Sequence, residues 1–214
     1  MSGSARRIVA VDGPAASGKT TLAHRLAVHF GLDFLDTGLL YRAVAWQLLH
    51  AGRPFTDAAS AVVAARAITA ADLDPTRLRS DSLSQGASVV AAIPEVRQAL
   101  LGFQRRFGRH GPGAVLAGRD IGTVVRPDAS HKIFVTASVE ERARRRCREL
   151  QALGVPTIYD QVLASLQERD ARDRLRAVAP LAPASDAFVI DTTEQDIDAA
   201  FEAARAYVAA PARG

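Results

Sequence analysis

The chain has 214 residues, of which 48% are hydrophobic and 23% are charged, a balance typical of folded globular proteins and not of disordered ones. No apolar run approaches the ~20 residues of a membrane span, and the short polar start at residues 1–7 lacks the pattern of a signal peptide. A single cysteine, Cys147, excludes an internal disulfide and fits a reducing compartment, so we expect a cytoplasmic protein with no membrane partner.

The net charge of +4 leaves a nucleic-acid partner open, because basic surfaces bind phosphate backbones. All but two of the basic residues are arginines, and arginine is also suited to bidentate contact with small phosphate groups. The positions of the arginines along the chain therefore have to separate these two interpretations.

Short apolar runs alternate with amphipathic segments along the chain. We expect a helix at 20–30 that ends at Gly31, and a helix at 95–107 with Pro94 in its first turn. Residues 55–85 are Ala- and Asp-rich and have only weak helical periodicity. We predict strands at residues 7–12, 32–35, 114–117, 132–135 and 188–190, and helices at 20–30, 37–49, 84–92, 95–107, 139–153, 158–174 and 197–208.

This alternation predicts an α/β fold, a three-layer sandwich with a mostly parallel five-stranded sheet and helices on both faces. Ligands of such sheets bind at the carboxyl ends of the strands. We expect the motifs described next to lie at that edge.

The first motif, after strand 7–12, satisfies G-x-x-x-x-G-K-[ST] and precedes a helix. Glycines let the backbone wrap phosphates, and the helix start adds its positive dipole end. Lys19 is expected to reach the β- and γ-phosphates, and Thr20 to offer its hydroxyl to Mg²⁺. A chance glycine turn is the competing interpretation. The residues expected to bind ATP here are Gly13, Pro14, Ala15, Ala16, Ser17, Gly18, Lys19, Thr20 and Thr21.

Three further clusters follow along the chain. Thr37 opens a helix with Tyr41 and Arg42 one turn in, so these residues either hold a small polar ligand or form an N-cap and an interface. Arg119 and Asp120 follow strand 114–117, where arginine can bind a phosphate and aspartate can accept from an amine; a salt-bridged loop is the alternative.

The third cluster, residues 168–176, alternates acidic and basic side chains, as solvated helix faces do. Its position between a Gly-Pro break and a second proline-rich turn instead suits a mobile lid at about 154–180. We expect its arginines to stay apart and solvated until phosphates arrive, because like charges repel.

These motifs resemble the bacterial cytidylate kinase family, P-loop nucleoside monophosphate kinases, in the family's order over nearly the whole chain. The run Gly-Arg-Asp-Ile-Gly-Thr-Val-Val at 118–125 is specific to that family rather than to P-loop proteins at large. The other segments that carry the resemblance are 13–21, 35–42, 88–97, 127–128, 132–138, 141–143, 169–176, 180–181, 186 and 190–192.

The resemblance implies transfer of the γ-phosphoryl group of ATP to CMP or dCMP with Mg²⁺, by a monomer of one domain, 1–214, with a shortened CMP-binding insert at about 54–113. Lys19, Arg119, Arg169 and Arg176 would be catalytic, and Arg145 and Arg146 would add charge near the ATP phosphates. The residues implied to bind CMP are Thr37, Tyr41, Arg42, Ser88, Arg97, Arg119, Asp120, Arg169, Asp173 and Arg176.

Two departures from the family pattern accompany the resemblance. Ala117 stands where an acidic residue commonly precedes Gly-Arg-Asp, which puts the Mg²⁺ shell in question. Residues 72–83 are too few for the small sheet that the insert usually contains.

Two alternative functions stay open on the sequence. Another small-acceptor P-loop kinase would need a different pattern of hydrogen-bond donors and acceptors at Ser88, Arg97 and Asp120. An RNA-binding or nucleotide-sensing module would need aromatic stacking residues beside its arginines, and aromatic residues are only 6% of the chain.

Overall fold

The computed structural model describes residues 6–109 and 111–211; most of the polar start at 1–7 lies outside this part. Its strands are β1 (Arg7–Asp12), β2 (Asp33–Asp36), β3 (Gly113–Gly118), β4 (His131–Thr136) and β5 (Phe188–Asp191). Its α-helices are α1 (Lys19–Phe30), α2 (Thr37–His50), α3 (Ala58–Ala67), α4 (Asp81–Val90), α5 (Pro94–Arg106), α6 (Val139–Ala152), α7 (Tyr159–Leu175) and α8 (Ile197–Ala209).

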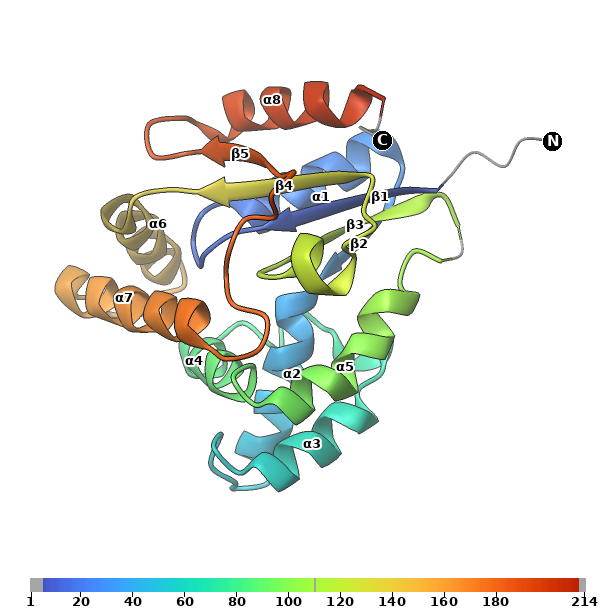
Figure 1. Ribbon diagram of the computed structural model, residues 1–214. Coiled ribbons are helices and arrows are strands. Elements are labelled where there is room, and N and C mark those ends of the chain that lie inside the picture. The colour runs from blue at the N-terminus through green and yellow to red at the C-terminus, as the bar shows by residue number, and fades with distance from the viewer. Residues whose placement is uncertain (1–5, 110, 212–214) are drawn as a thin grey trace.

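The strands form one sheet in the order β2-β3-β1-β4-β5, and every pairing is parallel (Figure 1). The predicted five-stranded, mainly parallel sheet is confirmed. In the register of the central strand, Asp12 lies opposite Gly118 of β3 and Phe134 of β4. The loops that follow β1 and β3 therefore start next to each other.

Helices cover both faces of the sheet (Figure 1). Successive side chains of a strand point to opposite faces, so Val9 and Val11 of β1 pack with α1 and α8, while Ile8 and Ala10 pack on the other side. On that second side lies a π-helical turn at Ile121–Val125, which the sequence did not predict. The predicted three-layer α/β sandwich is confirmed.

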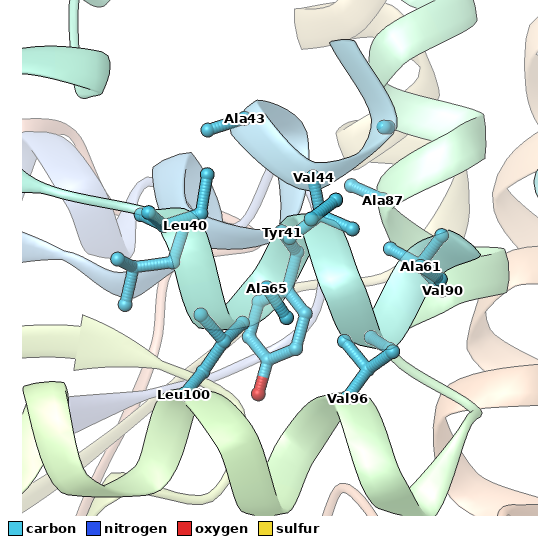
Figure 2. Close-up of a cluster of buried hydrophobic side chains, with 14 of the residues drawn as sticks. Leu40, Tyr41, Ala43, Val44, Ala61, Ala65, Ala87, Val90, Val96 and Leu100 are labelled. Carbon is cyan, nitrogen blue, oxygen red and sulfur yellow. The ribbon is translucent and has the colours of Figure 1, made fainter. Parts of the chain in front are cut away.

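A separate apolar cluster joins α2, α3, α4 and α5 (Figure 2). Leu40 and Val44 of α2, with Leu100 of α5, are fully buried there. Figure 2 shows the ring of Tyr41 among these side chains, with its hydroxyl directed toward α5. Four helices thus share one core, which fixes the position of α4 and α5 beside the sheet.

Most predicted boundaries hold to within two residues, and the segment 55–85 differs most. It contains α3, a 3-10 turn at Ala70–Asp72 and the start of α4. Helix α4 begins at Asp81, three residues before the predicted start, because Ser80 caps it by accepting from the amide of Leu83. Residues 72–83 contain no strand, as their small number suggested. Among the described residues no helix is long and apolar enough to cross a membrane.

Candidate active site

The loop between β1 and α1 turns back on the start of the helix. Gly13 lies so close to β4 that a Cβ there would be 2.1 Å from the carbonyl oxygen of Val135. Gly18, the N-cap of α1, has φ +85°, a left-handed value that favours glycine, and Ala16 adopts φ 58°. This backbone leads into the N-terminus of α1, where helix amides are free to bind an anion.

Lys19 is buried in this loop, with 6% of its surface exposed, and its Nζ donates to the carbonyl oxygen of Pro14 at 3.0 Å. Burial lowers the pKa of Lys19 well below its usual value, and the nearby cations Arg119 and Arg169 lower it further, whereas Asp36 opposes them. The ammonium group thus lies in a region with excess positive charge.

A pocket of about 840 Å³ opens beside the loop. Residues from the loop, α2, α4, α5, the segment after β3, α6 and α7 line it, so it gathers segments that are distant in sequence. The predicted site residues on its wall are Ala15, Ala16, Gly18, Lys19, Thr20, Thr21, Thr37, Tyr41, Arg42, Ser88, Arg97, Arg119, Asp120, Arg146, Arg169, Asp173 and Arg176.

Two buried carboxylates, each paired with arginine, form one wall of the pocket. Asp120 forms an ion pair with Arg97, and side-chain exposures of 8% for Arg97 and 7% for Asp120 show that both are withdrawn from water. Asp173 accepts from Nε of Arg119 at 3.0 Å and from the hydroxyl of Ser88 at 3.4 Å. Burial alone would raise the pKa of Asp173, but the surrounding arginines lower it below its usual value. Asp173 therefore stays ionised.

The prediction that the arginines of residues 169–176 are solvated is wrong for the two that face the pocket. The side chain of Arg176 is 4% exposed and lies 3.7 Å from Asp120. Burial lowers the pKa of Arg169 to about 9, with Arg119 adding to the shift. Nε of Arg169 and one terminal nitrogen of Arg176 are buried without a hydrogen-bond partner. Helix α7 packs its inner face on the pocket, and of the arginines at 169–176 only Arg174, on its outer face, is exposed.

Some side chains that were predicted to contact a ligand form hydrogen bonds with other parts of the protein. The hydroxyl of Thr37 donates to the carbonyl oxygen of Ala117 at 2.8 Å, because β2 and β3 are neighbours, so its proton is used within the protein. Arg145 does not line the pocket; it binds Thr192 at 2.9 Å and Glu141 at 3.2 Å. Gly13, Pro14 and Ser17 are not among the residues that line the pocket.

Three residues at or near the pocket carried no role in the sequence analysis. Asp12 at the end of β1 accepts from the amides of Ile121 and Gly122, both at 2.8 Å, and burial raises its pKa to about 7. Asp36 lines the pocket and caps α2 through the amide of Gly38. Arg142 forms a buried ion pair with a residue of α7. An acidic residue at the end of a strand was the available signal for Asp12 and Asp36; Arg142 had none.

The oxygen donors of the pocket fit a magnesium ion. Thr20 and Asp36 both line it, and one carboxylate oxygen of Asp36 is not used by the cap of α2. No group of three or more His, Cys, Asp or Glu side chains in the described part of the chain could hold a metal. Magnesium needs no such group, because it keeps several waters and takes its remaining ligands from one or two protein oxygens and from phosphates.

The fold recurs in a solved structure of low sequence identity. A crystal structure of an uncharacterized protein from Eubacterium ventriosum matches with a TM-score of 0.53 and 14% identity, over 95% of this chain and 98% of the other. At this identity the match shows the fold alone.

Sequence comparisons place the chain in a family. The family model "Cytidylate kinase" matches residues 9–209. Cytidylate kinases from Methylocella silvestris and Paramagnetospirillum magneticum are 58% and 59% identical to it, covering 92% of this chain and 91% and 95% of theirs. One from Methylobacterium sp. is 58% identical over 97% of this chain and all of its own length. This chain therefore belongs to the cytidylate kinase family.

Proposed function

We propose that the chain transfers the γ-phosphoryl group of ATP to CMP or dCMP, giving ADP and CDP or dCDP. The observation that carries this proposal is one pocket in which the glycine-rich loop lies opposite a wall of buried carboxylates and arginines. Membership of the cytidylate kinase family supports the assignment of the acceptor.

The donor binds along the loop formed by residues 13–21. The backbone amides around Gly18 and the N-terminus of α1 bind the phosphates of ATP, and Lys19 reaches the β- and γ-phosphates. Arg146 lines the same pocket and adds positive charge, whereas Arg145 acts indirectly by bonding Thr192, whose hydroxyl donates to the carbonyl oxygen of Ser17 at 3.2 Å.

The acceptor base is read by Asp120, Arg97 and Ser88. The carboxylate of Asp120 accepts from the exocyclic amine of cytosine, since a carboxylate can only accept, and Arg97 holds that carboxylate in place. Tyr41 lines the pocket beside them, with the guanidinium of Arg97 5.6 Å from its ring centre.

The sugar and phosphate of the acceptor are held by the remaining wall residues. Asp173, which is ionised and lines the pocket, accepts from the sugar hydroxyls, and Arg169 donates to them. Arg42, Arg119 and Arg176 bind the CMP phosphate. The partnerless buried nitrogens of Arg169 and Arg176 support this assignment, because an unsatisfied buried donor is costly and phosphate oxygens supply the missing acceptors.

Catalysis is mainly positioning and charge stabilisation, because the transferred phosphoryl group develops charge on its oxygens. Lys19, Arg119, Arg169 and Arg176 surround the space between donor and acceptor and neutralise that charge. Thr20 and Asp36 would hold a magnesium ion, which would supply further positive charge to neutralise the phosphates. With Ala117 in the usual acidic position, Asp36 supplies the carboxylate at this edge of the sheet.

Two parts of a single kinase domain enclose the acceptor. The segment 54–113, which contains α3, α4 and α5, forms the CMP-binding insert, and the segment 154–180, which contains α7, forms the lid. The pocket is complete within one chain, so the proposed enzyme acts as a monomer. Since its donor is ATP, the proposed location is the cytoplasm.

A coupled assay of ADP release against a panel of nucleoside monophosphates tests the proposal. We expect turnover with CMP and dCMP, weaker turnover with UMP, and none with AMP or GMP, which lack the pyrimidine amine pattern. The same assay with Lys132→Met measures the effect of removing the other lysine, which lies outside the pocket. Equal turnover with all pyrimidine and purine acceptors would contradict the assignment of the base-reading residues.

A further inference from the structure

Arg142 of α6 forms hydrogen bonds with three segments of the chain at once. Its Nε donates to the carbonyl oxygen of Ala137, at the end of β4, at 3.0 Å. One terminal nitrogen donates to the carbonyl oxygen of Ala15 at 3.2 Å. Both terminal nitrogens bind the carboxylate of Asp170 on α7, at 3.2 and 2.6 Å. A planar guanidinium is the side chain that can satisfy such a set of acceptors.

The pair of Arg142 and Asp170 is isolated from water. The side chains are 3% and 8% exposed, and neither lines the substrate pocket. Its charges therefore do not contact substrate. A buried, bidentate pair of this kind is rigid in direction, because moving either partner would leave a buried charge unpaired.

The contact with Ala15 reaches the loop at its conformationally constrained point. Ala15 is followed by Ala16, whose φ of 58° is left-handed, so the orientation of the peptide between them determines the turn of the loop. The side chain of Ala15 also packs with Ala143 of α6 and Leu166 of α7. The loop is thus fixed to α6 and α7 by an apolar contact on its side chain and a hydrogen bond on its carbonyl.

Asp170 lies on the helix that carries the acceptor-binding side chains. Arg169 and Asp173 are spaced i and i+4, so they share the face of α7 that lines the pocket, and Arg176, the C-cap of α7, lines the same pocket. Asp170 and Leu166, four residues apart, share the face that contacts α6 and the loop. The pairing of Asp170 therefore sets the rotation of α7 about its axis and hence the direction of the pocket-facing residues.

We infer that Arg142 and Asp170 are positioning residues that couple donor binding to acceptor binding. This inference rests on the proposed function. ATP phosphates order the loop at Ala15, Arg142 transmits that order to Asp170, and α7 then presents its arginines and Asp173 to the acceptor. The second substrate binds an already ordered helix, so it loses less conformational entropy on binding. By linkage, each substrate raises the affinity for the other by the same factor.

The test is titration calorimetry of CMP, with and without a saturating non-hydrolysable ATP analogue and Mg²⁺. In the unaltered chain we expect the analogue to raise CMP affinity at least about 5-fold. Asp170→Asn removes the negative charge of the pair and leaves Arg142 without its counter-charge. The double variant Arg142→Met with Asp170→Leu removes both charges, so neither is left unpaired. We expect the coupling factor to fall close to one in both variants.

Two further measurements separate coupling from folding. Asp160→Asn makes the same change at an exposed position of the same helix, and we expect it to keep the coupling of the unaltered chain. The double variant keeps a folded protein measurable if Asp170→Asn unfolds, because two apolar side chains replace the pair. If the pair only stabilises the fold, its removal should lower the melting temperature and leave the ratio of the two CMP affinities unchanged.

The outcomes are distinguishable from those of the proposed function. If CMP does not bind the unaltered chain under either condition, the proposed function fails and the inference fails with it. If CMP binds with the same affinity in the presence and absence of the analogue, the function stands and the coupling is wrong. A double variant that retains the full coupling factor would also overturn the role of Arg142 and Asp170.

Discussion

The donor half and the acceptor half of the pocket are built in different ways. The donor half is one continuous segment, residues 13–21, made of the loop after β1 and the first turn of α1; its binding groups are mainly backbone amides, and Lys19 is its one charged side chain. The acceptor half takes side chains from α2, α4, α5, the segment after β3 and α7, and it relies on buried ion pairs such as Arg97 with Asp120. Local sequence therefore encodes one half, and packing assembles the other.

The acceptor half holds several buried arginines close together. The pKa of Arg169 is lowered to about 9 by burial and then by Arg119, and burial likewise lowers the pKa of Arg42. Positive groups held this close destabilise the empty pocket, and anionic phosphates would relieve the repulsion. The acceptor half is thus arranged for a bound anion rather than for stability of the free chain.

The largest expected effect comes from the donor half. Lys19→Ala removes a cation that stabilises developing charge on the transferred phosphoryl group, so kcat should fall on the order of 10²-fold or more. Because the donor is common to all reactions, the loss should be the same factor for CMP, dCMP and UMP. Steady-state kinetics with each acceptor measures it. A loss confined to one acceptor would mean that the two halves are not functionally separate.

Asp120→Asn in the acceptor half should instead change selectivity. An amide can donate to the uracil carbonyl as well as accept, so kcat/KM for CMP relative to UMP should fall on the order of 10-fold. The substitution also weakens the buried pair with Arg97 and should lower the melting temperature. The ratio of the two kcat/KM values is the readout, since any loss of folded enzyme cancels. Asp128→Asn, at a 68% exposed carboxylate, is the matched control.

Asp12 connects the halves, because it ends the strand before the donor loop and accepts from the amides of Ile121 and Gly122. Its pKa is raised from 3.8 to about 7, so between these values the folded chain retains a proton that the unfolded chain has released. Its contribution to the free energy of unfolding is full below 3.8 and falls as pH rises toward 7, by about 1.4 kcal/mol per pH unit inside the window.

Urea unfolding across that pH window measures this contribution. The side chain in Asp12→Asn does not titrate, so the difference in unfolding free energy between the unaltered chain and the variant should change steadily from acid to neutral pH. Beyond pH 7 the difference should level off. Parallel curves for the two proteins would show that Asp12 does not titrate in this range.

The smallest effect is expected outside both halves. Arg25 and Asp198 form an ion pair at 2.7 Å between α1 and α8, and Asp198 is 78% exposed. Exposed pairs of this kind contribute less than about 1 kcal/mol, so Asp198→Asn should barely change the melting temperature or kcat/KM. A loss of activity comparable to that of Asp120→Asn would contradict the assignment of function to the pocket alone.

Sequence by itself determined the elements and the donor loop. Strand and helix boundaries follow hydrophobic period, glycine and proline positions, and side-chain caps, all of which act within a few residues. The spacing of Gly13, Gly18 and Lys19 identified the loop from neighbouring residues alone, whereas its contacts with β4, α6 and α7 belong to the tertiary structure. The α/β class followed from the alternation of these elements.

Tertiary structure decided which charges are buried and with what partners. Arg142 and Arg144 stand two residues apart on α6, yet their side chains are 3% and 57% exposed. The alternating charges of residues 168–176 are typical of a solvated face, whereas Asp170 and Arg176 of that segment are buried. A charge remains buried only where a distant segment supplies its counter-charge and hydrogen bonds, and that pairing depends on how α6, α7 and the sheet pack rather than on neighbouring residues.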